Sequence, residues 1–512
     1  MRKNKRVSMM KIDQFPTALR PYLIPEHRGR MVYECLGCKG QFDAERLLYV
    51  CPTCRDVLLI RDLNFERLTR IHSDTWRKIF DYRKMLNEQA LKGIFRYYEF
   101  MAPVIPLEDI LYLGEADTPL VAANGQLKAM VGMDFYFKSE GLNPSASFKD
   151  RGMACALSYL NTYAKKKRPK DLIAVCASTG DTSAAAALYA AYMGDSVKCV
   201  VLLPHGRITP QQLAQPLGNG ATVLEIPGLF DDCMKVVELL AENYQVALLN
   251  SKNSWRILGQ ESFSFEVAQA FDYDVSDKVV VVPIGNAGNI TAVMTGFLKF
   301  HTAGIIKHLP KIVGVQSEHA DPVYRFYREE DPQKRRFTPV AVRPSVAQAA
   351  MIGDPVSMPR VIDIARKYNQ IADRERIFFV QVKEQEIMDA MIVANRNGNI
   401  ACTQGGETLA GLMRAIEKGY VGSDEVGVLN STAHMLKFIP FQEMYFNNDF
   451  GPEFEIKPRK DLKNAPRMVK PRNVSTYPKP GSPLPPEEMR RFVHEMAGEI
   501  GRILKLEPID KT

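Results

Sequence analysis

The stretch that decides the fold runs from Ser139 to Met153 and reads Ser-Glu-Gly-Leu-Asn-Pro-Ser-Ala-Ser-Phe-Lys-Asp-Arg-Gly-Met. Residues 134–138 before it are apolar and aromatic, as in a strand, and residues 153–160 after it have a helical composition. Lys149 is therefore expected where a strand and its turn lead into a helix. A lysine there can be shifted toward its neutral, nucleophilic form by burial or nearby positive charge. Taken alone, it could equally be an exposed residue of the first helical turn.

Three further turns of this kind follow along the chain. Residues 177–185, Ala-Ser-Thr-Gly-Asp-Thr-Ser-Ala-Ala, come after an apolar run and open an alanine-rich helix. Their hydroxyl groups and backbone amides could bind an anion or simply cap the helix. Residues 285–289, Gly-Asn-Ala-Gly-Asn, follow an apolar strand, and such a turn lets backbone amides close on a phosphate. Residues 426–438 again run from an apolar strand into a polar turn.

Short β-branched runs alternate with longer helical stretches from about 113 to 440. This alternation predicts an α/β fold of βαβ units, with parallel sheets covered by helices on both faces. The predicted strands are Ile173–Cys176, Lys198–Leu203, Thr222–Ile226, Val246–Asn250, Val279–Ile284, Ile312–Gln316, Ile377–Val382 and Glu425–Leu429. Ligands of such sheets bind at the carboxyl ends of the strands. Lys149, Ser178, Gly285 and Ser431 all lie there, so we expect them to form one site.

In this order, the segments resemble threonine synthases from about Leu113 to Phe438, with a further match at Ile352–Ser357. The resemblance implies the fold type II pyridoxal-phosphate architecture of two doubly wound parallel-sheet domains, and a homodimer. It implies that Lys149 binds pyridoxal phosphate covalently and that Thr432 meets the ring nitrogen. The residues that it assigns to the cofactor are Lys149, Asp181, Gly285, Asn286, Ala287, Gly288, Asn289 and Thr432. The candidates for binding a phosphorylated amino-acid substrate are Lys138, Ser178, Thr179, Thr182 and Arg256.

The implied reaction is the conversion of O-phosphohomoserine and water into threonine and phosphate. Ser145, Ala146, 405–407 and Met435 depart from the family pattern on the presumed substrate side. Cysteate synthase, which uses O-phosphoserine and sulfite, and the related lyases and dehydratases therefore remain alternatives. An alternative of another class is a non-catalytic zinc-ribbon protein that binds nucleic acid. The intact lysine and phosphate loop argue against that alternative.

The nine cysteines fall into two groups. Those of 155–402 lie among apolar neighbours and indicate core positions in a reducing compartment. The others form two Cys-x-x-Cys pairs, the pattern of a closed tetrahedral zinc site. This predicts a structural zinc bound by Cys35, Cys38, Cys51 and Cys54.

Composition sets the remaining expectations. An apolar content of 46% and a charged content of 25% indicate a large globular protein, and the net charge of +8 is modest for 512 residues. No apolar run reaches the roughly 18 residues of a membrane span, and no apolar core follows the basic N-terminus. We expect a cytoplasmic protein without membrane or nucleic-acid partners. The predicted divisions are an arm and zinc-ribbon-like segment (1–60), a helical extension (61–112), a catalytic region (113–440) with a smaller subdomain (137–251), and a proline-rich linker with a C-terminal helix (441–512).

Overall fold

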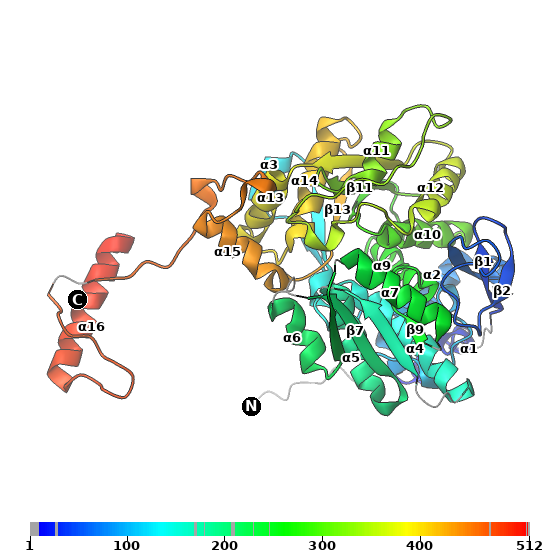
Figure 1. The fold of residues 1–512 in the computed structure, drawn as a ribbon, viewed down its shortest axis with the longest axis horizontal. Coiled ribbons are helices and arrows are strands. Elements are labelled where there is room, and N and C mark those ends of the chain that lie inside the picture. The colour runs from blue at the N-terminus through cyan, green and yellow to red at the C-terminus, as the bar shows by residue number, and fades with distance from the viewer. Residues whose placement is uncertain are drawn as a thin grey trace. The chain divides into compact units, whose positions relative to one another are not determined.

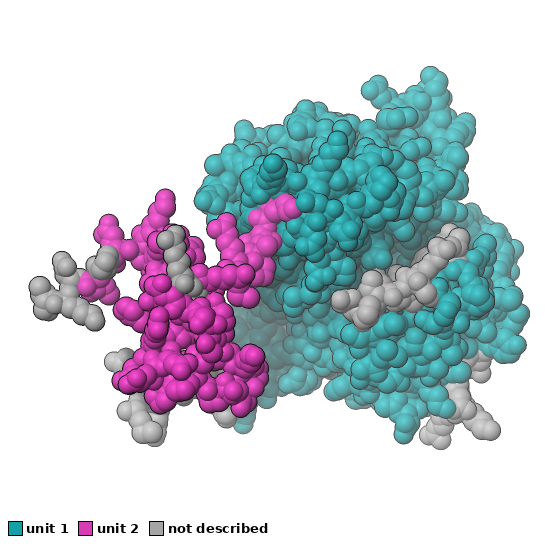
Figure 2. All heavy atoms as spheres, turned by 60° about the vertical axis from the view of Figure 1, so that its left-hand side comes forward, with its two compact units in different colours: residues 1–462 teal, residues 463–512 magenta. Residues whose placement is uncertain are grey.

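The computed structural model describes residues 10–25, 29–167, 172–178, 180–205, 210–228, 230–244, 246–470, 473–507 and 509, and the chain divides into two compact units, Met1–Leu462 and Lys463–Thr512 (Figure 2). The helices are α1 (Arg20–Leu23), α2 (Ser73–Met85), α3 (Gly125–Val131), α4 (Lys149–Lys167), α5 (Asp181–Met193), α6 (Pro210–Gly218), α7 (Phe230–Asn243), α8 (Ser254–Gln260), α9 (Ser262–Ala270), α10 (Gly288–Thr302), α11 (Pro322–Arg328), α12 (Met358–Ala372), α13 (Glu384–Arg396), α14 (Thr403–Glu417), α15 (Ile439–Asn447) and α16 (Pro486–Leu504). The strands are β1 (Met31–Cys35), β2 (Gln41–Asp43), β3 (Leu58–Asp62), β4 (Leu120–Ala122), β5 (Phe135–Ser139), β6 (Ile173–Ala177), β7 (Lys198–Pro204), β8 (Thr222–Ile226), β9 (Val246–Leu248), β10 (Lys278–Pro283), β11 (Lys311–Ser317), β12 (Ile377–Val382) and β13 (Val426–Ser431).

Two parallel sheets form the body of the first unit (Figure 1). The larger has six strands in the order β12-β11-β10-β13-β5-β4, and only β4 runs antiparallel to its neighbour. The smaller has four parallel strands in the order β8-β7-β6-β9. In β10, Val279 and Val281 join one hydrophobic core while Val280 and Val282 join another. Both faces of this strand are therefore covered, as its unbroken apolar run predicts.

The predicted alternation of strands and helices is confirmed, with small shifts at the ends. Strand β9 stops at Leu248, although the prediction extended to Asn250. The strand ends because the side-chain amide of Asn250, and not its backbone, bonds to the neighbouring strand β6. Its Oδ1 accepts from the backbone N–H of Ala177 at 2.9 Å and its Nδ2 donates to the Ala177 carbonyl at 2.7 Å. The three-residue edge strand β4 was not predicted, and it carries too few residues for a periodic signal.

The N-terminal strands form a separate three-stranded sheet, ordered β2-β1-β3, that packs on α8. The indole Nε1 of Trp255 donates to the hydroxyl of Tyr33 in β1 at 2.9 Å. The same indole stacks on Tyr159 of α4, with the ring centroids 4.2 Å apart. Ser254 Oγ donates to the Leu58 carbonyl of β3 at 2.8 Å. This sheet is thus joined directly to two helices of the catalytic body.

The segment between this sheet and β4 combines α2 with short 3₁₀ turns. Its aromatic side chains pack on α9 and α10. Phe80 stacks on Phe300, and Phe100 contacts both Phe265 and Phe300 at ring edges. The predicted packing of a helical segment on the catalytic body therefore has a physical basis in one aromatic cluster.

The predicted boundary at residue 440 falls inside the first compact unit, which extends to Leu462. Tyr445 of α15 is fully buried there, and its hydroxyl donates to Asp389 of α13. The second unit contains α16, whose apolar side chains at 493, 500, 503 and 504 are exposed. The predicted domain limits, including the one at 440, remain predictions. Within the described part of the chain, no helix combines the length and apolarity needed to cross a membrane.

Candidate active site

Lys149 is the first residue of α4 and follows the turn that leaves β5. The backbone N–H of Phe148 donates to the Thr432 carbonyl at 2.8 Å, and Ser147 forms a β-bridge with Ala433. The turn is thereby fixed to the segment that follows β13. Ala146 has a φ of 65°, a conformation that glycine adopts most readily.

Close packing of α4 on α8 brings a second cation beside Lys149. Two glycines permit the approach. A Cβ at Gly259 would lie 2.1 Å from the Arg151 carbonyl, and one at Gly152 would lie 3.0 Å from the Arg256 carbonyl. Any larger residue would push the helices apart. Arg256 is consequently buried next to the start of α4.

Within the described part of the chain, Arg256 has no counter-ion. One guanidinium nitrogen, Nη1, donates to the Leu249 carbonyl at 2.7 Å, and Nε has no hydrogen-bond partner among the described residues. Burial lowers the pKa of Arg256 to about 10, and among the described residues no carboxylate acts on it. A buried, uncompensated guanidinium is an anion-binding group.

The glycine-rich turn 285–289 begins α10 and forms another wall. Ala287 precedes the helix with a φ of 62°, and Gly285 lies against the backbone of 349–350, where a Cβ would be 3.0 Å from the Ala350 Cα. Asn289 Nδ2 is buried without a hydrogen-bond partner in the described structure. Free amides at the start of a 15-residue helix can hold an anion of the size of phosphate.

Thr432 and Asp181 complete the polar lining. Thr432 Oγ1 lies 3.8 Å from the thiol of Cys402, which caps α14. Asp181 begins α5, and its Oδ1 lies 3.0 Å from Nζ of Lys437. Lys437 belongs to a 3₁₀ turn, η9 (Met435–Phe438), that follows β13. Asp181 and Lys437 thus connect the smaller sheet to the larger one.

Lys149, Asp181, Arg256, Asn289 and Thr432 line one cavity of about 70 Å³, and Lys149 is half-buried in it. The complete lining is Phe148, Lys149, Asp181, Ser251, Arg256, Ile257, Gln260, Pro283, Gly285, Asn286, Ala287, Gly288, Asn289, Ala349, Ala350, Gln404 and Thr432. All the residues predicted to bind the cofactor are therefore together, along with Arg256 from the substrate candidates.

The electrostatics of the cavity favour a neutral amine. The pKa of Lys149 is lowered to about 7, chiefly by burial, with smaller contributions from the positive charges of Arg256 and Lys437, whereas the negative charge of Asp181 raises it. Above this pH, most Lys149 side chains carry a free electron pair and can act as nucleophiles.

Among the described residues, the substrate candidates Lys138, Ser178 and Thr182 lie outside the cavity lining. Lys138 is 1% exposed and its Nζ lies 2.7 Å from Glu266 Oε2, within a buried network that also contains Glu140 and Arg151. Its charge is therefore already compensated, and it serves the packing beneath the site. Ser178 Oγ caps α5 by accepting from the backbone N–H groups of Gly180 and Ser183, each at 3.2 Å. Thr182 is half-buried on α5, and Thr179 lies outside the described residues.

Sequence reasoning missed several lining residues. Gln260 lies four residues after Arg256 on α8, so helical periodicity could have placed it on the same face. Gln404 is 3% exposed, and neither atom of its amide has a hydrogen-bond partner in the described structure. In the sequence, Gln404 stands among other polar and glycine residues at the start of α14, so it carries no comparable signal. Ser251 lies two residues before the segment that resembles the family around Arg256, and it was not selected. Lys437, which contacts the lining residue Asp181, lies in the noted segment 426–438 and was not selected either.

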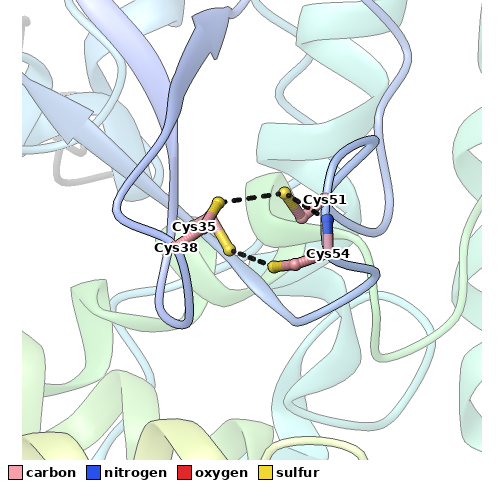
Figure 3. A group of neighbouring side chains, drawn as sticks. All are labelled: Cys35, Cys38, Cys51 and Cys54. Carbon is pink, nitrogen blue, oxygen red and sulfur yellow. Dashed lines mark hydrogen bonds between the residues drawn. The ribbon is translucent and has the colours of Figure 1, made fainter.

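The four N-terminal cysteines converge at the turns of the three-stranded sheet (Figure 3). The Sγ atoms of Cys35 and Cys54 are 3.4 Å apart, those of Cys38 and Cys51 are 3.6 Å apart, and all four lie within 4.8 Å of one another. A tetrahedral zinc with bonds of about 2.3 Å needs sulfur atoms about 3.8 Å apart. The cluster therefore has the dimensions of a metal site.

Comparisons with known proteins agree with this geometry. The family described as pyridoxal-phosphate dependent enzyme matches residues 111–432. Threonine synthase of Methanocaldococcus jannaschii is 33% identical over 415 residues, covering 80% of this chain and 93% of that protein. Threonine synthase 2, chloroplastic, of Arabidopsis thaliana is 36% identical over 378 residues, covering 73% of this chain and 70% of that protein.

Solved structures show the same fold. The crystal structure of threonine synthase from Escherichia coli superposes with a TM-score of 0.58 at 20% identity, covering 80% of this chain and 89% of that one. Diaminopropionate ammonia lyase of the same organism gives a TM-score of 0.54 at 16% identity, covering 67% and 90%. At these identities the likeness concerns the fold alone.

Proposed function

Because this chain belongs to the family of pyridoxal-phosphate dependent enzymes and matches threonine synthases over most of its length, we propose that it converts O-phosphohomoserine and water into L-threonine and phosphate. The observation that carries the choice of substrate is the uncompensated guanidinium of Arg256 in the Lys149 cavity. A phosphorylated amino acid supplies the missing negative charge, and a charged pair of this kind is among the stronger contacts available to a protein.

The lining fits pyridoxal phosphate. The unpartnered Asn289 Nδ2 and the backbone amides at the start of α10 suit its phosphate group. Lys149 faces the same cavity and is the residue to hold its aldehyde carbon. Bound there, the cofactor supplies the electron sink for amino-acid chemistry.

The remaining steps of the reaction fall to side chains of the cavity. Lys149, with its lowered pKa, can accept and return a proton near neutral pH. Arg256 would bind the substrate phosphate and stabilise it as a leaving group. Thr432 would offer a neutral hydroxyl to the ring nitrogen of the cofactor, where a carboxylate would hold a proton more firmly. The site therefore favours elimination and replacement over transamination.

We assign a structural zinc to Cys35, Cys38, Cys51 and Cys54, since four thiolates close the coordination sphere and leave no position for substrate. A cytoplasmic homodimer also belongs to this proposal, as does the division of the catalytic region into a larger part and a smaller subdomain around 137–251.

The decisive assay offers the purified protein O-phosphohomoserine alone and, separately, O-phosphoserine with sulfite. Threonine and phosphate in equal amounts from the first mixture would support the proposal. Cysteate from the second mixture without threonine from the first would overturn the choice of substrate in favour of cysteate synthase.

A further inference from the structure

Lys437 lies at the meeting point of three segments that surround Lys149. Its Nζ donates to the Ser145 carbonyl at 2.8 Å, in the turn that leads to Lys149. The same nitrogen lies 3.0 Å from Asp181 Oδ1, at the start of α5. Gln215 of α6 also donates to the Ser145 carbonyl, at 3.2 Å. One ammonium group therefore links η9, the lysine turn and the smaller sheet.

The ion pair is sheltered from water. The side chains of Lys437 and Asp181 are 14% and 6% exposed. A pair this well buried is screened much less than a surface pair, so the two charges act strongly on each other and on their neighbours. Asp181 lines the same cavity as Lys149, so the pair influences the protonation of the amine that must react, which a surface pair does not do.

Asp181 is the only negative partner acting on Lys149 among the described residues, and the other charges that face Lys149 are Arg256 and Lys437. A carboxylate that lacked its own counter-ion here would attract a proton onto Lys149 and hold it as an ammonium. An ammonium has no electron pair for an aldehyde carbon. Lys437 itself pairs with Asp181 and also acts electrostatically on Asp150, which accepts from the backbone N–H of Ser145 in the lysine turn.

We propose that Lys437 is a positioning residue that neutralises Asp181 at the cavity wall and so keeps Lys149 in its uncharged, nucleophilic form. The inference rests on the proposed function in that Lys149 is the residue that must react. It does not depend on which phosphorylated amino acid is the substrate.

The test measures Lys149 directly in the cofactor-free protein. Trace acetylation with acetic anhydride across a pH series, read by peptide mass spectrometry, reports the fraction of Lys149 that is uncharged at each pH. In the parent protein the midpoint is expected at about 7. Lys437→Met should raise the midpoint by about 1–3 pH units, the usual effect of a nearby opposite charge, because Asp181 then lacks its counter-ion.

Two further variants test whether Lys437 acts on Lys149 through its positive charge and through Asp181. Lys437→Arg keeps the positive charge and should restore the low midpoint. In Asp181→Asn/Lys437→Met, the carboxylate is also gone, so the midpoint should return to the parent value or below it. Lys367→Met, which removes a lysine paired with Asp363 on α12, is the matched control and should change nothing at Lys149.

An unchanged midpoint in a folded Lys437→Met protein would overturn the proposal, and so would an equally raised midpoint in the double variant. If Lys437→Met does not fold, Asp181→Asn alone decides, because the proposal requires it to lower the midpoint. Since no substrate or cofactor enters the measurement, a failed threonine assay would leave this result standing.

Discussion

Arg256 is the residue on which substrate choice depends most directly. Replacing it with Gln removes the charge that would pair with the substrate phosphate. Loss of one partner of a buried charged contact typically costs about 2–5 kcal/mol, which corresponds to roughly a 30-fold or greater rise in KM for the phosphorylated substrate. Steady-state kinetics would measure this, together with the visible absorbance of bound cofactor, which should persist. Arg366→Gln on the surface of α12 is the control. An unchanged KM would exclude Arg256 from substrate binding.

Replacing Gln404 with Leu should raise stability and lower activity. Its amide is buried without hydrogen-bond partners in the described structure, so Gln404→Leu removes an unsatisfied polar group and should raise the free energy of unfolding of the cofactor-free protein by about 1–3 kcal/mol. If the amide binds substrate or cofactor, kcat/KM should fall by roughly 2- to 10-fold, the effect of one neutral hydrogen bond. Denaturant titration and kinetics test the two halves separately. A more stable protein with full activity would show that the amide has no ligand.

At the scale of elements, the contact between α4 and α8 positions the site. Gly259→Ala would place a Cβ 2.1 Å from the Arg151 carbonyl, so the helices must separate. Overpacking of this kind costs about 1–3 kcal/mol of unfolding free energy, and cofactor binding should weaken because Lys149 and Arg256 move apart. Gly125→Ala at the start of α3 is the control, since a Cβ there meets nothing within 4 Å. Equal stability of the two variants would contradict the role of this contact.

The cysteine cluster gives a second test at this scale. We expect about one zinc per chain, lost in Cys38→Ser/Cys54→Ser and retained in Cys199→Ser, whose thiol is buried outside the cluster. Metal loss should lower the temperature of unfolding, because the sheet that the cluster holds packs on α8. Elemental analysis and calorimetry would measure both. If the zinc-free protein unfolded at the same temperature, the metal would have no structural role.

For the whole molecule, sequence reasoning was strongest where a pattern repeats. The valine run of β10 and its companions predicted the parallel sheets, and strand-to-helix turns predicted the residues that line the cavity. It was weakest where a side chain's environment depends on distant partners. Nothing around Lys138 in the sequence shows that Glu266 neutralises it, and nothing near Arg256 shows that its guanidinium has no such partner. Those facts arise only when separate segments pack together.

Trp255 packs between the N-terminal sheet and α4, so its fluorescence should report on both the cysteine cluster and the cavity. The chain has two tryptophans, so Trp76→Phe leaves Trp255 as the sole indole emitter, wedged against Tyr33 and Tyr159 and adjacent in sequence to Arg256. Its emission should respond to zinc removal, through the sheet, and should be quenched when a chromophoric cofactor occupies the cavity. A fluorescence titration that responds to neither would show that the indole is uncoupled from both sites. A response to both would let metal and cofactor occupancy be followed in a single cuvette without any added dye.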